Sequence, residues 1–289
     1  MRYVAGAFRL VLVALLILVI LFIIYCLFPF VKGRRRGRLI RRVSGWIPAV
    51  LGIKVHVKGR IPDEGARLTG WADSGRGYMV CADHISFVDV FVMNALMPVR
   101  FVAKKEIGNW PVFGTITTGV GTIYIDRSNR RAVLDVARSM AEVLKAGQNV
   151  LFFPEGTTGP GNSLLPFHAN LFAAAVAAEA EILPVAIRYT LHGETTTITS
   201  YKDLSLWEVL KRIVLTSGLA CEISILDPIS AAGRDRRELC LEASRVMAAA
   251  LGMSDATAAH EEAVRRHREE RLKEIEAKEA VKTSQEEEV

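Results

Sequence analysis

The longest uncharged apolar segment of the chain runs from Leu10 to Val31, 22 residues without a charged side chain. As an α-helix, at about 1.5 Å per residue, it would be about 33 Å long, enough to cross the roughly 30 Å hydrocarbon core of a bilayer. Secretory signal sequences have a shorter apolar stretch and a small-residue cleavage site. The pattern therefore predicts a retained N-terminal membrane-anchor helix, either single-pass or monotopic.

Short apolar runs alternate with amphipathic ones behind this segment. Runs typical of strands occur at 53–57, 78–82, 100–103, 122–125, 150–153, 182–187 and 220–226, the first as an edge strand. Helical patterns occur at 87–96, 132–144, 169–180, 204–217 and 235–251, with Ser128 as the expected cap of the second. Residues 63–77 are polar and Gly-rich and are expected to form a loop. This alternation predicts an α/β domain with a mixed, largely parallel sheet flanked by helices.

Charge is distributed unevenly along the chain. The formal net charge is +6, but residues 1–42 hold nine of the 37 basic residues and none of the 31 acidic ones. The remaining 247 residues therefore carry a net charge of −3, which argues against a nucleic-acid partner. Seven positive charges between Lys32 and Arg42 are expected to contact anionic lipid headgroups. By the positive-inside rule, the body of the protein is expected at the cytoplasmic face of the inner membrane.

These patterns divide the chain into a membrane anchor with a polybasic flank over 1–42, an α/β domain over 43–254, and a charged tail over 255–289. In the tail, pairs such as Glu261 and Arg265 lie four residues apart and predict a solvated helix. The four cysteines and six histidines lack C-x-x-C and H-E-x-x-H spacing. We therefore expect reduced, unpaired thiols and no metal site.

The segment Cys81-Ala-Asp-His-Ile-Ser-Phe-Val-Asp89 contains the first candidate for catalysis. His84 and Asp89 are five residues apart, so they cannot share one helical face and can meet only across a turn. In that arrangement a carboxylate fixes the tautomer of a histidine that acts as general base. The same segment also matches a capping box, Ser86-x-x-Asp89, which needs no catalysis. Strand alternation separates Cys81 from His84, so Cys81 is expected to be a core thiol.

Two further segments carry residue types that bind anions. In Gly119-Val-Gly-Thr-Ile-Tyr-Ile-Asp-Arg127 an arginine follows a strand, where it can hold a phosphate or carboxylate, or instead pair with the adjacent Asp126. In Phe152-Phe-Pro-Glu-Gly-Thr-Thr-Gly-Pro-Gly-Asn162 a strand runs into a loop whose N–H groups can approach an anion. This loop lacks the G-K-[ST] ending of a P-loop, which argues against a nucleotide triphosphatase.

Followed by Leu183-Pro-Val-Ala-Ile187, these segments resemble the sequence blocks of the glycerolipid acyltransferase family, which includes bacterial 1-acylglycerol-3-phosphate acyltransferases. The resemblance covers the chain from about residue 40 to about residue 230. It implies that His84 removes the proton of an acceptor hydroxyl, that Asp89 orients His84, and that the alkoxide attacks an acyl thioester directly. It also implies that N–H groups near the helix start after His84 hold the oxyanion.

The resemblance implies binding roles as well. By similarity, Arg127 and Lys105 bind the acceptor's phosphate, and Glu155, Gly156 and Thr157 shape the acceptor pocket. It implies an acyltransferase domain over 43–254, a lyso-lipid acceptor in the bilayer, and an acyl carrier protein or coenzyme A thioester as co-substrate. No other cofactor and no metal are expected.

One position departs from the family pattern. The third block usually continues with Arg after Glu-Gly-Thr, whereas this chain has Thr158. The change removes a possible phosphate ligand, so two acceptors stay open: 1-acyl-sn-glycerol-3-phosphate, giving phosphatidic acid, and lyso-ornithine lipid or another lysophospholipid. A non-enzymatic, lipid-binding membrane protein is the third hypothesis. The intact pair of His84 and Asp89 argues against it, because a scaffold needs no base.

Overall fold

The computed structural model describes residues 2–126, 130–267 and 269–271. Its strands are β1 (Lys54–Lys58), β2 (Met79–Ala82), β3 (Arg100–Lys104), β4 (Ile123–Ile125), β5 (Val150–Phe152), β6 (Glu181–Leu191), β7 (Glu194–Thr195), β8 (Leu219–Ile225) and β9 (Ile229–Ser230). Its α-helices are α1 (Arg2–Phe22), α2 (Gly33–Ser44), α3 (Trp46–Leu51), α4 (Glu64–Thr69), α5 (Val88–Leu96), α6 (Phe113–Gly119), α7 (Arg130–Lys145), α8 (Ala173–Ala178), α9 (Leu206–Leu215) and α10 (Arg236–Leu251). A π-helical turn η1 (Ile23–Leu27) continues α1, and η2 (Lys105–Asn109) and η3 (Ala169–Phe172) are short 3-10 helices.

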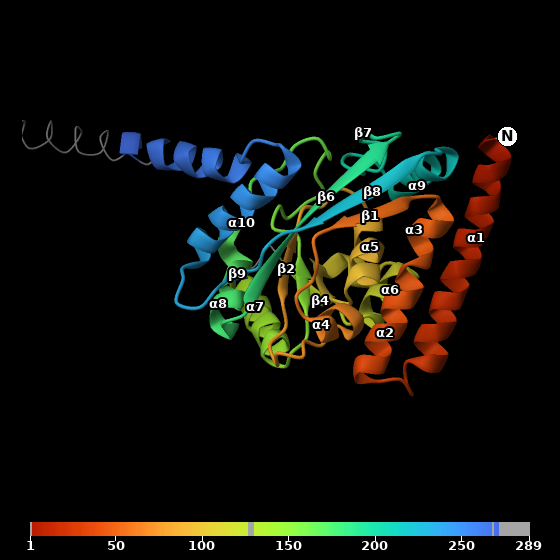
Figure 1. The fold of residues 1–289 in the computed structure, drawn as a ribbon, viewed down its shortest axis with the longest axis horizontal. Helices are drawn as coiled ribbons and strands as arrows, with labels where there is room; N and C mark the ends of the chain where they lie inside the picture. The colour runs from red at the N-terminus through yellow and green to blue at the C-terminus, as the bar shows by residue number, and fades with distance from the viewer. Residues whose placement is uncertain (1, 127–129, 268, 272–289) are drawn as a thin grey trace, which may run out of the picture.

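All of these strands belong to one sheet, in the order β1-β8-β6-β2-β5-β3-β4, with β7 and β9 also paired to β6 (Figure 1). The pairs β1/β8, β2/β6, β2/β5, β3/β5 and β3/β4 are parallel. β6 pairs with β7, β8 and β9 in the antiparallel direction. The predicted α/β fold with a mixed, largely parallel sheet flanked by helices is confirmed, and β1 is an edge strand as expected.

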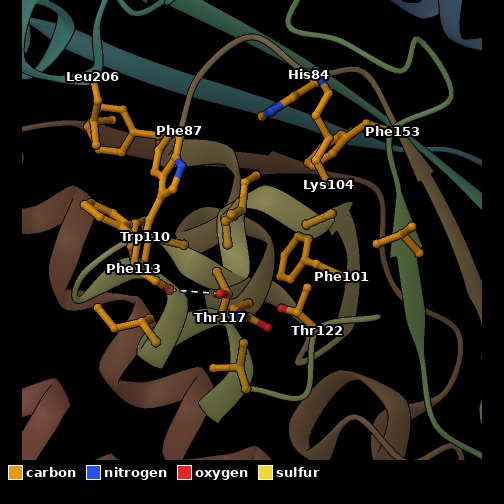
Figure 2. A pocket seen from close by; sticks show the side chains of 18 of the residues that line it. His84, Phe87, Phe101, Lys104, Trp110, Phe113, Thr117, Thr122, Phe153 and Leu206 are labelled. Atoms are coloured by element: carbon orange, nitrogen blue, oxygen red, sulfur yellow. Dashed lines mark hydrogen bonds between the residues drawn. The ribbon is translucent and has the colours of Figure 1, made fainter. Parts of the chain in front are cut away.

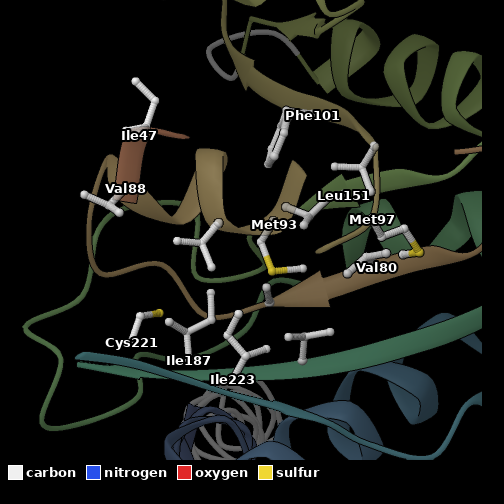
Figure 3. Close-up of a cluster of buried hydrophobic side chains, with 14 of the residues drawn as sticks. Ile47, Val80, Val88, Met93, Met97, Phe101, Leu151, Ile187, Cys221 and Ile223 are labelled. Carbon is white, nitrogen blue, oxygen red and sulfur yellow. The ribbon is translucent and has the colours of Figure 1, made fainter. Parts of the chain in front are cut away.

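Helices cover both faces of the sheet, and each face has its own core. On the α5 face, Val88 and Met93 pack against strand residues such as Val80 and Leu151 (Figure 3). Fully burying one such side chain stabilises the fold by roughly 1.5–3 kcal/mol. The opposite face is covered by α7, α8 and α10 and contains Cys81, which is fully buried. Cys81 therefore lies in the core as predicted, on the face opposite α5.

The N-terminal half of α1 packs directly on α9 (Figure 1). A Cβ atom at Gly6 would lie 2.7 Å from Cδ2 of Leu215, so a larger residue there would require the Leu215 side chain to shift. The guanidinium of Arg9 donates to the carbonyl oxygens of Val214 at 3.1 Å and Thr216 at 2.9 Å. These carbonyls lie at the C-terminal end of α9, where the helix dipole favours a positive charge.

The rest of the N-terminal helix also lies on the domain. Ile24 contacts α6, where a Cβ atom at Gly119 would lie 2.9 Å from Ile24 Cδ1. The guanidinium of Arg36 on α2 lies over the ring of Phe28, 4.2 Å from its centroid. Among the described residues, Tyr3–Leu27 is the one helical segment long and apolar enough to cross a membrane. Its outer face exposes large apolar side chains, including Tyr3, Val4, Phe8, Val11, Leu15, Leu18 and Phe22.

Several helices lie outside the predicted pattern. The segment 63–77, expected to be a loop, contains α4, so that expectation was wrong. The carboxylate of Asp63 accepts the N–H of Ala66 at 2.8 Å as an N-cap, and Gly70 ends the helix in the left-handed conformation. α2, α3 and α6 were not predicted either, and β6 extends to Leu191, beyond the predicted end at residue 187.

The first residues of the segment predicted as a charged tail pack against the α/β domain. Asp255 Oδ1 accepts the hydroxyl of Ser244 at 2.7 Å and the N–H of Thr257 at 3.1 Å. Thr257 is buried, and its Oγ1 accepts the N–H of Phe167 at 3.0 Å. The predicted tail helix is present over 256–267 and 269–271, and residues 272–289 lie outside the described part of the chain.

Candidate active site

His84 and Asp89 face each other across the turn between β2 and α5. β2 ends at Ala82 and α5 begins at Val88, which places both residues around the same turn. His84 Nδ1 lies 2.9 Å from Asp89 Oδ2, with the histidine side chain 15% exposed and the aspartate side chain fully buried. The meeting of these two side chains that the spacing predicts is therefore present.

The carboxylate of Asp89 accepts hydrogen bonds at both oxygens. Besides His84, Oδ2 accepts the N–H groups of Ile85 at 2.7 Å and Ser86 at 2.8 Å. Oδ1 accepts the hydroxyl of Tyr189 at 2.6 Å. These bonds offset the cost of burying a carboxylate. The Ser86 hydroxyl accepts from the N–H of Val88 and not of Asp89, so only half of the capping box forms.

Two aromatic rings hold the imidazole of His84. The ring of Phe153 is stacked on it, with 4.0 Å between the centroids (Figure 2). The ring of Tyr201 meets it edge-on, with centroids 6.1 Å apart and planes at 81°. Because Nδ1 is engaged by Asp89, the second ring nitrogen, Nε2, is the one left to exchange a proton.

Glu155 anchors the turn that carries His84. Its Oε1 accepts the N–H of His84 at 3.2 Å, and its Oε2 accepts the N–H of Leu165 at 3.1 Å. Burial raises the pKa of Glu155 to about 7, against the lowering effect of these two N–H groups. Gly156 and Thr157 line the cavity described next, whereas Glu155 does not. The three residues expected to shape the acceptor pocket therefore lie together, with the carboxylate directed at the backbone.

A cavity of about 1240 Å³ lies beside His84 (Figure 2). Its walls come from α5, β3, η2, α6, the loop after β5 and residues 201–206, and also from α1, η1 and α2. Most of the lining side chains are apolar, among them Ile20, Ile23, Phe28, Leu39, Val43, Phe87, Phe91, Phe101, Trp110, Phe113, Ile116 and Val120. The N-terminal helices predicted as a membrane anchor thus also form part of the candidate site.

Two lysines line this cavity in the described part of the chain. Lys104, at the end of β3, lies near His84 and Phe153 (Figure 2), and Lys202 follows Tyr201. Lys105, the lysine expected to bind phosphate, is exposed at the start of η2 and does not line the cavity.

Arg127, which was expected to bind phosphate, and Ser128, the expected N-cap of the helix predicted at 132–144, lie outside the described residues. Thr158, which replaces the usual arginine of the third block, is buried and lines the cavity. Acidic side chains also line it, at Glu106, Asp126 and Asp203.

Comparison with known proteins identifies the family. The family model described as Acyltransferase matches residues 52–188. The lyso-ornithine lipid O-acyltransferase of Pseudomonas aeruginosa is 33% identical over 217 residues, which are 75% of this chain and 79% of that protein. The chain belongs to the lysophospholipid acyltransferase family.

Other acyltransferases align over shorter regions or only in structure. The 1-acyl-sn-glycerol-3-phosphate acyltransferase of Neisseria gonorrhoeae is 41% identical over 162 residues, which are 56% of this chain and 64% of that protein. The match thus spans less than two thirds of this relative. The crystal structure of the 1-acyl-sn-glycerophosphate (LPA) acyltransferase PlsC from Thermotoga maritima has a TM-score of 0.62 and 21% identity, over 87% of this chain and 97% of that one. The acyltransferase fold is shared with that enzyme.

Sequence reasoning missed two contacts of the candidate site. Phe153 follows β5, where Phe152 pairs with Cys81, so strand alternation places Phe153 on the same face as His84. The alternation along 150–153 could be read from the sequence, whereas the pairing of β5 with β2 could not. Tyr189 had no comparable signal, because it reaches Asp89 from 100 residues away along the chain.

No metal site or reactive thiol accompanies the described part of this site. Among the described residues, no group of three or more His, Cys, Asp and Glu side chains could hold a metal ion. All four cysteines are unpaired. Burial raises the pKa of Cys81 well above its ordinary value, which keeps this thiol in its unreactive, protonated form.

Proposed function

We propose that this chain transfers a fatty acyl group from an acyl thioester to the free hydroxyl of 1-acyl-sn-glycerol-3-phosphate, giving phosphatidic acid. The observation that carries the proposal is the hydrogen-bonded pair of His84 and Asp89 at the wall of a large, mostly apolar cavity. The relative from Neisseria gonorrhoeae, 41% identical, is named for this activity. An apolar cavity beside a general base suits substrates with long acyl chains.

In the proposed reaction His84 is the general base. Its Nδ1–H donates to Asp89, and its Nε2 accepts the proton of the acceptor hydroxyl as the oxygen attacks the thioester carbonyl carbon. A C–O bond forms, the tetrahedral intermediate collapses with cleavage of the C–S bond, and the imidazolium returns the proton to the leaving thiolate. Asp89 stabilises the transient imidazolium. The substrate hydroxyl takes the place of an enzyme nucleophile, so no acyl-enzyme forms.

The oxyanion requires a donor that Asp89 has not already engaged. The resemblance implied N–H groups near the start of the helix, but those of Ile85 and Ser86 are bound to the carboxylate of Asp89. The next N–H along the turn belongs to Phe87, which lines the cavity and makes no backbone hydrogen bond with the described residues. We assign the oxyanion to this N–H group, close to the positive end of the α5 dipole.

The acceptor's phosphate is proposed to bind at the end of β3 and β4. Arg127 and Lys105 are the candidates from the family resemblance, and Lys104 is the lysine of this segment that lines the cavity. Replacing Arg127 by Ala should raise KM for the acceptor and leave kcat little changed, because a phosphate contact distant from the reacting hydroxyl contributes mainly to binding. Lys104→Ala tests the structural candidate in the same assay.

Lyso-ornithine lipid is the alternative acceptor. Thr158 leaves the cavity wall without the cation that is usual at this position, and the match to the lyso-ornithine lipid O-acyltransferase of Pseudomonas aeruginosa covers 75% of the chain. An ornithine headgroup lacks the phosphate that this cation would bind, which is consistent with a neutral side chain there.

A panel of lyso-lipids tests the function. Purified protein is incubated with lysophosphatidic acid, lyso-ornithine lipid and other lysophospholipids, each with an acyl carrier protein or a coenzyme A thioester as donor. Product formation from lysophosphatidic acid supports the proposal, and transfer only to another acceptor replaces it with the alternative. Transfer to none of them supports a non-enzymatic lipid-binding protein. His84→Ala is the control that must lose turnover while remaining folded.

We further propose that the chain is monotopic, at the cytoplasmic face of the inner membrane. α1 is packed on α9 at one end and on α6 at the other, so it cannot both cross the bilayer and keep these contacts with a cytoplasmic domain. Its exposed apolar face would instead lie within one leaflet. Exposed Trp46, Trp110 and Trp207 supply aromatic side chains suited to the membrane interface.

Labelling of a cysteine added before Met1 distinguishes the two membrane arrangements. In a variant whose native Cys26 is replaced by Ser, this added cysteine should react with a membrane-impermeant maleimide only after the cells are lysed. Labelling in intact spheroplasts would place the N-terminus outside the cytoplasm and establish a single-pass helix.

A further inference from the structure

We infer that Tyr189 is a positioning residue of the transfer reaction, which acts through Asp89 to fix the orientation of His84. The inference rests on the proposed roles of His84 and Asp89. The Tyr189 hydroxyl donates to Asp89 Oδ1 at 2.6 Å, and both side chains are completely buried. A short O–H to carboxylate bond of this kind is among the stronger hydrogen bonds in proteins.

The two oxygens of the Asp89 carboxylate have different numbers of hydrogen-bond partners. Oδ2 is held by His84 and by the N–H groups of Ile85 and Ser86. Among the described residues, Oδ1 is held by Tyr189 alone. Without that hydroxyl the buried Oδ1 would lose this donor, and the carboxylate could rotate to share the donors that now face Oδ2. Such a rotation would move the acceptor of the His84 Nδ1–H and, with it, the direction of Nε2.

Tyr189 connects the base to the centre of the sheet. It lies on β6 and pairs in register with Cys221 of β8, and Figure 3 shows Cys221 and Ile187 on the strands below α5. The N–H of Ile187 on the same strand donates to Asp83 Oδ1 at 2.7 Å. β6 therefore holds the catalytic turn on both sides of His84, at Asp83 and at Asp89.

The hydroxyl of Tyr189 has no role that packing alone would require. A phenylalanine ring would fill the same space in this core, and volume-conserving exchanges of this kind are well tolerated. Burial and the negative charge of Asp89 raise the pKa of Tyr189 well above its ordinary value, so the hydroxyl keeps the proton that it donates. The oxygen atom is thus placed as a permanent donor to the carboxylate that orients the base.

Tyr189→Phe tests the inference in the full-length protein purified in detergent. We expect kcat to fall about tenfold and KM for the lyso-lipid to stay within about twofold, because the change affects the base and not the acceptor site. Tyr78→Phe is the matched control: Tyr78 is also buried, its hydroxyl interacts with Glu181, and it lies at the opposite end of β2 from His84. This control should keep the wild-type kcat.

A double-mutant cycle separates positioning through Asp89 from a general loss of packing. The low activity of Asp89→Asn is measured with a radioactive acceptor. In this background Tyr189→Phe should cause no further loss of kcat, because the carboxylate through which Tyr189 acts is gone. An equal tenfold loss in both backgrounds would overturn the inference. A wild-type kcat for Tyr189→Phe would also overturn the inference. A Tyr189→Phe protein that no longer folds would overturn it as well, because the hydroxyl would then serve stability and not the orientation of His84.

His84→Ala distinguishes failure of this inference from failure of the proposed function. If His84→Ala is fully active, the proposed mechanism fails and Tyr189 has no base to position. If His84→Ala is inactive while Tyr189→Phe retains the wild-type kcat, the mechanism stands and only the role of Tyr189 is rejected.

Discussion

The ring of Phe153 lies nearly parallel to the imidazole of His84, with 4.0 Å between the ring centroids and 13° between the planes. This stacking restricts the imidazole to one plane, and Asp89 fixes its rotation within that plane. Phe153→Leu keeps an apolar side chain but removes the flat surface. Since an aromatic pair contributes about 0.5–1.5 kcal/mol, we expect kcat to fall about three- to tenfold, with little change in melting temperature. Steady-state kinetics check this, and an unchanged kcat would show that stacking plays no part in orienting the base.

Asp89→Asn should be the most damaging change that keeps the shape of the site. The neutral amide of asparagine no longer stabilises the imidazolium form of His84, and its single acceptor oxygen cannot replace both carboxylate oxygens that now accept hydrogen bonds. By analogy with serine-hydrolase triads, we expect kcat to drop by about 10²- to 10⁴-fold at a similar KM. Asp135→Asn, an exposed change on α7, is the control that should leave kcat unchanged.

Glu155 should make the stability of the protein depend on pH. Its pKa is about 7 in the folded protein and 4.5 ordinarily, so between these values the folded state binds more protons than the unfolded state. This contribution is fully present below about pH 4.5 and is lost as the pH rises through about 7, with a total on the order of 3 kcal/mol. Melting temperatures of wild-type protein and Glu155→Gln across this range check the prediction. The variant should show a flatter profile, and parallel profiles would contradict it.

Filling the cavity should change which acyl chains are accepted. Ile116 on α6 is buried and lines the cavity, so Ile116→Phe reduces the apolar volume beside the base. We expect at least a tenfold lower kcat/KM for the longest thioesters and little change for the shortest, because only long chains reach the added ring. Competition between donors of different chain length measures this. An equal loss for all lengths would indicate damage to the fold instead.

The first residues of the charged tail should stabilise the domain. Thr257→Val removes the hydroxyl whose oxygen accepts the N–H of Phe167 and which forms a hydrogen bond with the Ser244 hydroxyl. Leaving a buried N–H group without an acceptor costs about 1–3 kcal/mol, so the melting temperature should fall by several degrees. Thr195→Val, at an exposed position of β7, is the matched control and should melt like the wild type.

Much of the sheet could be predicted because its strands are continuous apolar runs, as buried parallel strands usually are. The runs at 150–153 and 182–187 became β5 and the first part of β6. α2 was missed because its arginines dominate the segment, while the apolar side chains that pack on the domain, such as Val43, are few. α4 is only six residues long, and its local signals were the N-cap Asp63 and the terminating Gly70.

The candidate site also has one part that local sequence predicts and another that depends on the fold. The turn that joins His84 to Asp89 depends on residues five positions apart, so local spacing predicted it. The contacts of Tyr189 and of Glu155 with this turn depend on which strands become neighbours, and periodicity does not encode that. Glu155 was expected near the acceptor, and the fold instead directs its carboxylate at the backbone of His84.

The position of α1 determines whether the rest of the chain can be studied without it. Ile20 and Ile23 of the apolar N-terminal helix are walls of the same cavity that contains His84. Deleting the helix to obtain a soluble enzyme would open the cavity to water and expose the apolar surface of α6 and α9. The helix proposed to attach the protein to the membrane is therefore also a wall of the proposed catalytic cavity, so a substitution at Ile20 or Ile23 would change both.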